Sequence, residues 1–134
     1  MNSSSVDFHS FPSITLETLK KYASASGDFN EIHTNESVAK KVGLPGIIAH
    51  GMLIAAYIAR RAQDYAEQEC SLKDFEMAEF QTRFKAMTLL GDTPSVGGTV
   101  RTQSESELIL DLVAKNQKGE VTTTGIAKFK RHPA

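Results

Sequence analysis

The sequence predicts an α+β fold in which an antiparallel sheet wraps around one central buried helix. Residues 47–59 are apolar on almost every face and residues 60–69 turn amphipathic, which is typical of a helix buried at its N-terminal end. From residue 74 onward apolar and polar residues alternate with a period of two, which indicates strands. Consecutive strands after one buried helix favour a sheet that covers this helix.

The size and charge of the chain limit the classes of function. With 134 residues and 14.6 kDa, we expect one domain over residues 1–134. Hydrophobic residues make up 40% and charged residues 23%, which is typical of a globular protein. Because 15 basic and 16 acidic residues leave a net charge of −1, no strong field favours nucleic acid or an anionic membrane as a partner.

The first elements follow from turn and capping residues. A short strand is expected over 6–11, closed by Pro12. A helix over 15–25 follows, which Ser13 or Thr15 can cap through a side-chain oxygen.

The middle of the chain combines a loop with two helices. Residues 26–35 are dense in turn-forming residues and predict an ordered loop. A short helix over 36–42 ends at Gly43, and the central helix is expected over 51–68.

Three strands are predicted in the second half of the chain, and a break in the alternation of the first suggests a bulge near Ala78-Glu79 or an earlier strand end. Turn-forming pairs mark the expected connections at Gly91-Asp92, Gly97-Gly98, Glu105-Ser106 and Lys118-Gly119. The strand faces are formed by Phe80, Thr82, Phe84 and Ala86, by Leu108, Leu110, Leu112 and Ala114, and by Val121, Thr123, Gly125, Ala127 and Phe129.

Cysteine usage and the N-terminus predict a cytoplasmic protein. The lone Cys70 cannot form an internal disulfide, and no group of Cys and His residues has the spacing of a zinc site. The N-terminus lacks the basic start and apolar run of a signal peptide, and no apolar stretch is long enough to span a membrane. We therefore expect neither a membrane nor a metal as a partner.

The loop over 26–35 holds the first candidate site. Asp28, Asn30 and His33 lie within six residues, and a folded loop can turn the carboxylate and the imidazole toward one water molecule. The alternative is a turn stabilised by Asp28 beside an incidental histidine, and spacing alone does not decide between the two. An EF-hand loop is excluded because His33 and Ala39 occupy its required Gly and Glu positions.

The second candidate is His50-Gly51 at the start of the central helix. The first N–H groups of a helix have no internal partner, and a glycine there allows an oxygen atom to approach closely. Such a donor can stabilise an enolate-like oxygen. Alternatively, Gly51 serves chain entry or close packing and His50 is a structural histidine.

Two segments of the chain together resemble a known family. They run from Tyr22 to His33, with Ser26-Gly27-Asp28 at the centre, and from His50 to Leu53. In this combination they resemble the MaoC-like, R-specific enoyl-CoA hydratases of the hot-dog fold.

The resemblance implies a reaction and a role for each matching residue. Asp28 and His33 would be the catalytic pair, and the amide of Gly51 the oxyanion donor. The implied reaction is reversible syn hydration of a trans-2-enoyl thioester of CoA or acyl carrier protein to the (R)-3-hydroxyacyl thioester. No cofactor is implied. The substrate is expected to contact Asn30, His50 and Met52.

The sequence departs from the family pattern at two positions. Glu31 replaces the usual proline and puts a third ionisable group near the pair, and Ala59 stands where many members have serine. These changes bring rate, substrate preference and activity into question. An acyl tunnel would be lined by Met52, Met77, Phe84 and Met87.

The resemblance also implies a homodimer in which two sheets join edge to edge, which would cover an exposed sheet edge. Two other functions stay open: a non-catalytic or partner-dependent acyl-thioester-binding subunit of a heteromeric dehydratase, and a hot-dog thioesterase. The absence of Asp and Glu from 51 to 63 argues against the thioesterase, which usually has a carboxylate on the central helix.

Overall fold

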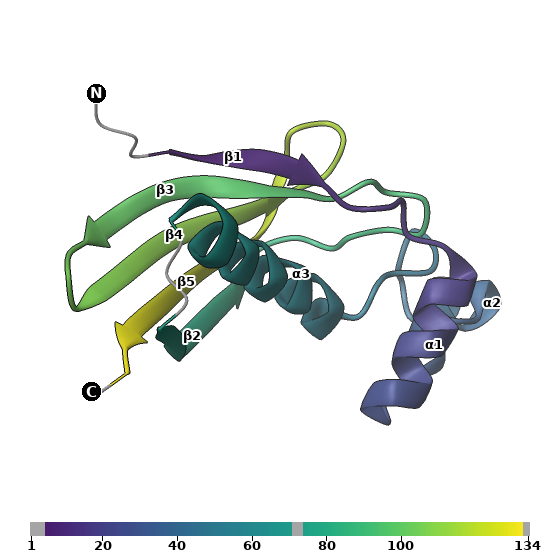
Figure 1. The fold of residues 1–134 in the computed structure, drawn as a ribbon. Helices are drawn as coiled ribbons and strands as arrows, with labels where there is room; N and C mark the ends of the chain where they lie inside the picture. Colours follow the sequence, from purple (N-terminus) through teal and green to yellow (C-terminus); the bar gives the residue numbers. More distant parts are fainter. Residues whose placement is uncertain (1–4, 71–73, 133–134) are drawn as a thin grey trace.

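The computed structural model describes residues 5–70 and 74–132, and its main feature is a five-stranded antiparallel sheet that curves around one helix (Figure 1). The predicted α+β arrangement is therefore confirmed. From one edge to the other, the strands are β1 (Ser5–Ser10), β3 (Ser95–Gln103), β4 (Glu107–Lys115), β5 (Val121–Arg131) and β2 (Phe75–Phe84).

The helix inside the sheet is α3 (Gly51–Asp64), which continues as a π-helical turn over Tyr65–Glu69. The expected central helix over 51–68 is thus confirmed. Its apolar face, with Leu53, Ile54 and Ile58, joins the core that the sheet forms with Leu108, Leu110, Leu112 and Phe129. A Cβ at Gly125 would lie 2.8 Å from Ile58, so glycine allows α3 to approach β5 closely.

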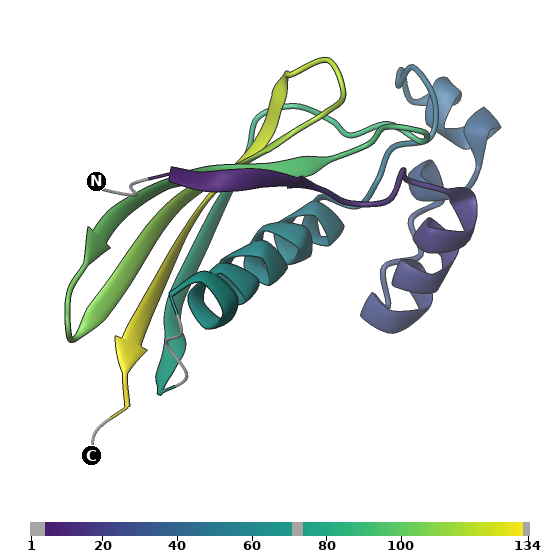
Figure 2. The same ribbon diagram turned by 45° about the horizontal axis from the view of Figure 1, so that its top comes forward.

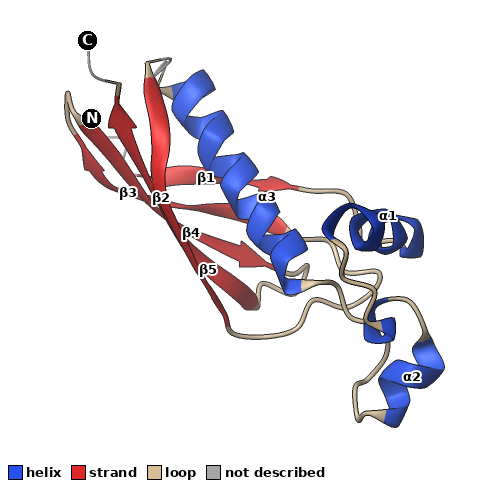
Figure 3. Cartoon of the chain, turned by 90° about the horizontal axis from the view of Figure 1, so that it is seen from below, coloured by secondary structure: helices blue, strands red, loops and turns tan. Residues whose placement is uncertain are grey.

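The two remaining α-helices lie beyond one end of the sheet rather than on its face (Figure 2). Helix α1 (Leu16–Ser26) is capped by Thr15, whose side chain accepts a hydrogen bond from the N–H of Thr18. It ends at Gly27, in the left-handed conformation with φ of 80°. Helix α2 (Glu36–Lys41) follows the loop after α1, as predicted (Figure 3).

The register of the strands confirms one prediction and corrects another. Pairing of β2 with β5 shifts between Met77 and Glu79, where the sequence suggested a bulge. The expected connection at Gly97-Gly98 is wrong, because both glycines lie inside β3. A Cβ at Gly98 would overlap the Asp111 carbonyl oxygen on β4, and one at Gly97 would lie 2.6 Å from the Phe8 ring. These glycines permit close approach of neighbouring strands rather than a turn.

Arg61 fastens α3 to the edge strand β1. Its guanidinium is 2% exposed, donates to the Asp7 carbonyl oxygen at 2.9 Å and pairs with Glu69 at 3.0 Å. Charge-assisted hydrogen bonds of this kind are stronger than neutral ones, so they hold the end of the helix against the sheet.

None of the helices in the described part of the chain combines the length and the apolar character needed to cross a membrane.

Candidate active site

The loop after α1 is folded by its own side chains. The N–H of Asn30 donates to Asp28 Oδ1 at 3.2 Å, and the N–H of Ile32 donates to Asn30 Oδ1 at 3.1 Å. The second bond caps a short 3₁₀-helix, Glu31–His33. The turn expected as the alternative to a site is therefore present, and it presents His33 on the same side as Asp28.

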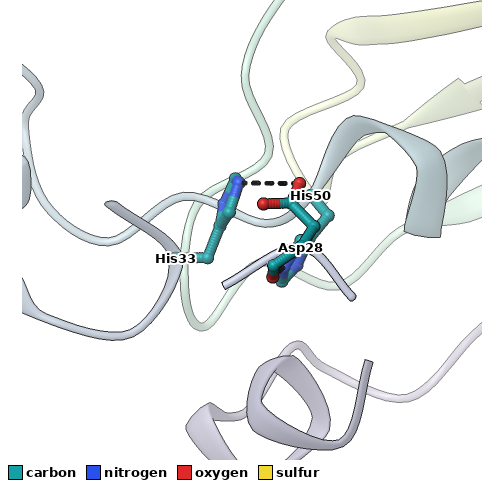
Figure 4. Close-up of side chains that lie close together, drawn as sticks. All are labelled: Asp28, His33 and His50. Atoms are coloured by element: carbon teal, nitrogen blue, oxygen red, sulfur yellow. Dashed lines mark hydrogen bonds and ion pairs between the residues drawn. The ribbon is translucent and has the colours of Figure 1, made fainter. Parts of the chain in front are cut away.

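The hydrogen bonds of His33 fix which ring nitrogen is free. Its Nδ1 lies 2.8 Å from the carbonyl oxygen of Ile48, and a carbonyl only accepts, so Nδ1 carries the proton. The neutral ring then has a lone pair on Nε2. This atom lies 3.9 Å from Asp28 Oδ2 (Figure 4). The distance is too long for a direct hydrogen bond and suits a water that donates to both atoms.

The two groups differ in exposure. The His33 side chain is 9% exposed and the Asp28 side chain 51%. The imidazole is therefore enclosed by the surrounding protein, while the carboxylate is open to solvent.

His50 contacts both residues of this pair. Its ring is 2% exposed and stacks on His33 with a centroid distance of 3.8 Å, and its Nε2 lies 3.2 Å from the carbonyl oxygen of Asp28, to which it donates. Tyr22 packs edge-on against the His50 ring, with ring centroids 4.8 Å apart. Burial lowers the pKa of His50 from 6.5, and the hydrogen bond to Asp28 opposes this effect only in part. His50 is thus favoured in its neutral form and holds the backbone of Asp28 in place.

Asp28, His33 and His50 form the one cluster of three potential metal-ligating side chains found in residues 5–70 and 74–132. Their ligand atoms lie within 4.8 Å of one another, a proximity that the sequence spacing did not predict. The stacking of the two rings produces it. Each ring already uses one nitrogen in a hydrogen bond to a carbonyl oxygen, so Asp28, His33 Nε2 and His50 Nδ1 are the remaining ligand atoms.

Gly51 lies next to this cluster as the first residue of α3, so its N–H has no partner within the helix. A cavity of about 380 Å³ opens beside it. The lining is formed by Gly51 together with Tyr22, Ser26, Asp28, His50, Met52 and Phe84. The predicted residues Asp28, His50, Gly51 and Met52 therefore share one cavity.

Other predicted residues are placed differently. The Asn30 side chain serves the turn of its own loop, and Glu31 is exposed at the start of the 3₁₀-helix. Ala59 lies two turns into α3 and is half-buried. Of the expected tunnel residues, Met77 packs against the core instead of lining a described cavity.

The sequence did not single out the contact between Phe84 and Gly51. The Phe84 ring lies 3.1 to 3.4 Å from the position that a Cβ of Gly51 would take. Phe84 stands 33 positions later in the chain, at the end of β2. Its alternation pattern predicted a strand face and the family resemblance a tunnel wall, but neither predicted a contact with Gly51. No local signal could have indicated this contact.

Comparison with known proteins points to one family. Residues 3–125 match the family described as "MaoC like domain". Fatty acid synthase 2 of Mycosarcoma maydis is 31% identical over 120 residues, which cover 87% of this chain and 3% of that protein. The 3-hydroxyacyl-thioester dehydratase X of Mycobacterium tuberculosis is 49% identical over 45 residues, or 34% of this chain and 16% of that protein. The chain thus spans only a small part of these curated relatives.

A solved structure shares the fold over nearly the whole chain. The (R)-hydratase from A. caviae involved in PHA biosynthesis matches with a TM-score of 0.81 and 22% identity, covering 98% of both chains. This likeness confirms the expected hot-dog fold.

Proposed function

Because the chain belongs to the MaoC-like domain family, we propose that it is an R-specific hydratase of trans-2-enoyl thioesters, which also runs in reverse as a dehydratase of (R)-3-hydroxyacyl thioesters. The observation that carries the proposal is the 3.9 Å separation of His33 Nε2 and Asp28 Oδ2, both of which can accept a proton from one water. The activities of the dehydratase and hydratase relatives agree with it.

The proposed mechanism moves one proton of this water. The water oxygen attacks the β-carbon of the enoyl group and keeps one of its protons as the new hydroxyl. The other proton passes through the Asp28 and His33 pair to the α-carbon on the same face. The electron pair of the double bond moves toward the thioester carbonyl and returns to form the new bond between the α-carbon and hydrogen.

Gly51 supplies the stabilisation of the intermediate charge. Its free N–H stands at the positive end of the α3 dipole and is proposed to donate to the thioester oxygen. Such preorganised donors are strong where water is excluded, since their dipoles need no rearrangement during the reaction. No metal is needed in this scheme, because the thioester accepts the electron pair.

The assembly is also part of the proposal. Strands β1 and β2 are the two edges of the sheet in the described chain, and pairing with a second copy would cover an edge. We propose a homodimer. The alternative, a subunit that needs a different partner chain for catalysis, is less favoured because Asp28 and His33 both come from this chain.

The test is hydration of crotonyl-CoA by the purified chain, followed by loss of the absorbance of the conjugated thioester. We expect loss of absorbance and an (R)-3-hydroxybutyryl-CoA product in chiral analysis. Absence of hydration with every chain length, on CoA and on acyl carrier protein, would contradict the proposal. Activity that appears only after a homologous chain is added would support the partner-dependent alternative.

A further inference from the structure

A second cavity also borders Gly51. Its volume is about 150 Å³. Besides Gly51 and Phe84, its walls include Ile48, Ile54, Ala86, Met87, Thr88 and Thr123. It contains none of the candidate acid and base groups, and its aliphatic side chains suit a hydrocarbon rather than a polar group.

Among the described residues, Gly51 and Phe84 alone line both this apolar cavity and the cavity that contains Asp28. The aromatic ring therefore forms a partition between the two spaces. Its carbons lie 3.1, 3.3 and 3.4 Å from the position of a Cβ on Gly51, so the ring rests directly on the glycine. A residue larger than glycine would push the partition away.

The partition is not part of the packed core. Phe84 is the last residue of β2 and is 50% exposed, whereas core residues around it, such as Ile54, are 2% exposed. Since half of its surface is exposed in the single chain and Phe84 is not part of the buried core, we expect its removal to leave the packing of α3 on the sheet in place. Substitution of Phe84 can therefore change the shape of the site with little effect on the free energy of unfolding.

We infer that Phe84 determines the acyl-chain length accepted by the site, by closing the apolar cavity to the tail of the enoyl thioester. This inference rests on the proposed function. A short enoyl group fits in the cavity beside Asp28, while a longer tail must pass the position of the Phe84 ring to reach the walls formed by Ile48, Ile54 and Met87. The natural chain accordingly prefers short trans-2-enoyl thioesters.

The experiment compares kcat/KM of the full chain and its Phe84→Ala and Phe84→Leu variants on trans-2-enoyl-CoAs from four to twelve carbons. Each methylene transferred from water to an apolar site contributes about 0.8 kcal/mol, or about fourfold. With several methylenes in the opened cavity, Phe84→Ala should raise the ratio of kcat/KM for the eight-carbon to the four-carbon substrate by at least about tenfold. Phe84→Leu should raise this ratio of kcat/KM by a smaller factor. Leu90→Ala serves as the matched control, because Leu90 is also an exposed apolar side chain, at 38%, but lines neither cavity.

A binding measurement separates this inference from the proposed function. Calorimetry with butyryl-CoA and octanoyl-CoA, which have no double bond to hydrate, should show the same change of preference in Phe84→Ala. An unchanged preference in both kinetics and binding would overturn the role of Phe84 while leaving a hydratase in place. A changed binding preference without hydration by any variant would support the role of Phe84 and contradict the proposed reaction.

Discussion

The imidazole rings of His33 and His50 lie stacked, with centroids 3.8 Å apart and planes inclined by 23°. Burial is the main cause that lowers the pKa of His50, and the neighbouring His33 ring lowers it further. The neutral form of His50 is therefore favoured beside the proposed base.

The first prediction concerns the stability of the fold against acid. Burial lowers the pKa of His50 below 6.5, so the unfolded chain binds a proton more readily than the folded chain. The part of the folding stability that depends on a neutral His50 is fully present above pH 6.5. It is lost as the pH falls toward the lowered pKa of His50. The loss from this one group approaches about 1.4 kcal/mol per pH unit at most.

Denaturant unfolding at pH values about one unit above and about one unit below 6.5 measures this effect. The variant His50→Gln should lose less stability between the two pH values than the natural chain does. His9→Gln is the control, because His9 is exposed on β1, and it should behave as the natural chain. Equal losses in all three proteins would show that His50 is not responsible.

A second prediction concerns Gly51→Ala. The new Cβ would lie 3.1 Å from the Phe84 ring, between the two cavities, and would restrict approach of a thioester oxygen to the N–H. We expect kcat/KM to fall by at least about tenfold, since loss of an oxyanion donor costs roughly 10²–10³ in rate. Stability should change by less than about 1 kcal/mol, because alanine is favoured over glycine within a helix and the half-exposed ring can shift. Unchanged kinetics would remove Gly51 from the mechanism.

A third prediction concerns metals. Asp28, His33 and His50 could hold an ion, but the proposed reaction uses the free Nε2 of His33 and the Asp28 carboxylate for water. Dialysis against a chelator should therefore leave the hydration rate within about twofold. A larger loss that is reversed by adding one divalent metal would contradict the metal-free mechanism.

A fourth prediction tests the packing of β3 on β4. Gly98→Ala would place a Cβ in overlap with the Asp111 carbonyl oxygen, in the middle of the sheet, where neither backbone can move freely. We expect a loss of about 3 kcal/mol or more in the free energy of unfolding. Gly46→Ala is the control, because no atom of the described residues lies within 4 Å of its Cβ position, and it should change stability by less than about 1 kcal/mol. Similar small effects in both variants would contradict the close approach.

These examples show what the sequence could predict. Thr15 as a helix cap and the bulge beside Glu79 depend on neighbouring residues, and each was one of the two possibilities that the local pattern indicated. Gly97-Gly98 was misassigned because a glycine pair indicates either a turn or close packing, and only the neighbouring strands decide between them.

The candidate site also combines features that the sequence could predict with features that it could not. The loop chemistry of Asp28 and Asn30 could be inferred from the residues. The stacking of His33 on His50 and the contact of Phe84 with Gly51 join segments far apart in the chain. Their geometry depends on how α1, α3 and β2 meet, which periodicity does not encode.

The most direct test of the proposed acid and base pair measures kcat for hydration of crotonyl-CoA by Asp28→Asn and His33→Asn. In the first variant the new amide oxygen can still accept from the N–H of Asn30, and in the second the new amide can still donate near Ile48, so the loop should stay folded. Glu31→Gln is the control, because it changes an exposed carboxylate of the same loop. We expect kcat to fall by roughly 10²–10⁴-fold in each of the first two variants and by less than about twofold in the control. A kcat near that of the natural chain in either Asp28→Asn or His33→Asn would contradict the proposed mechanism.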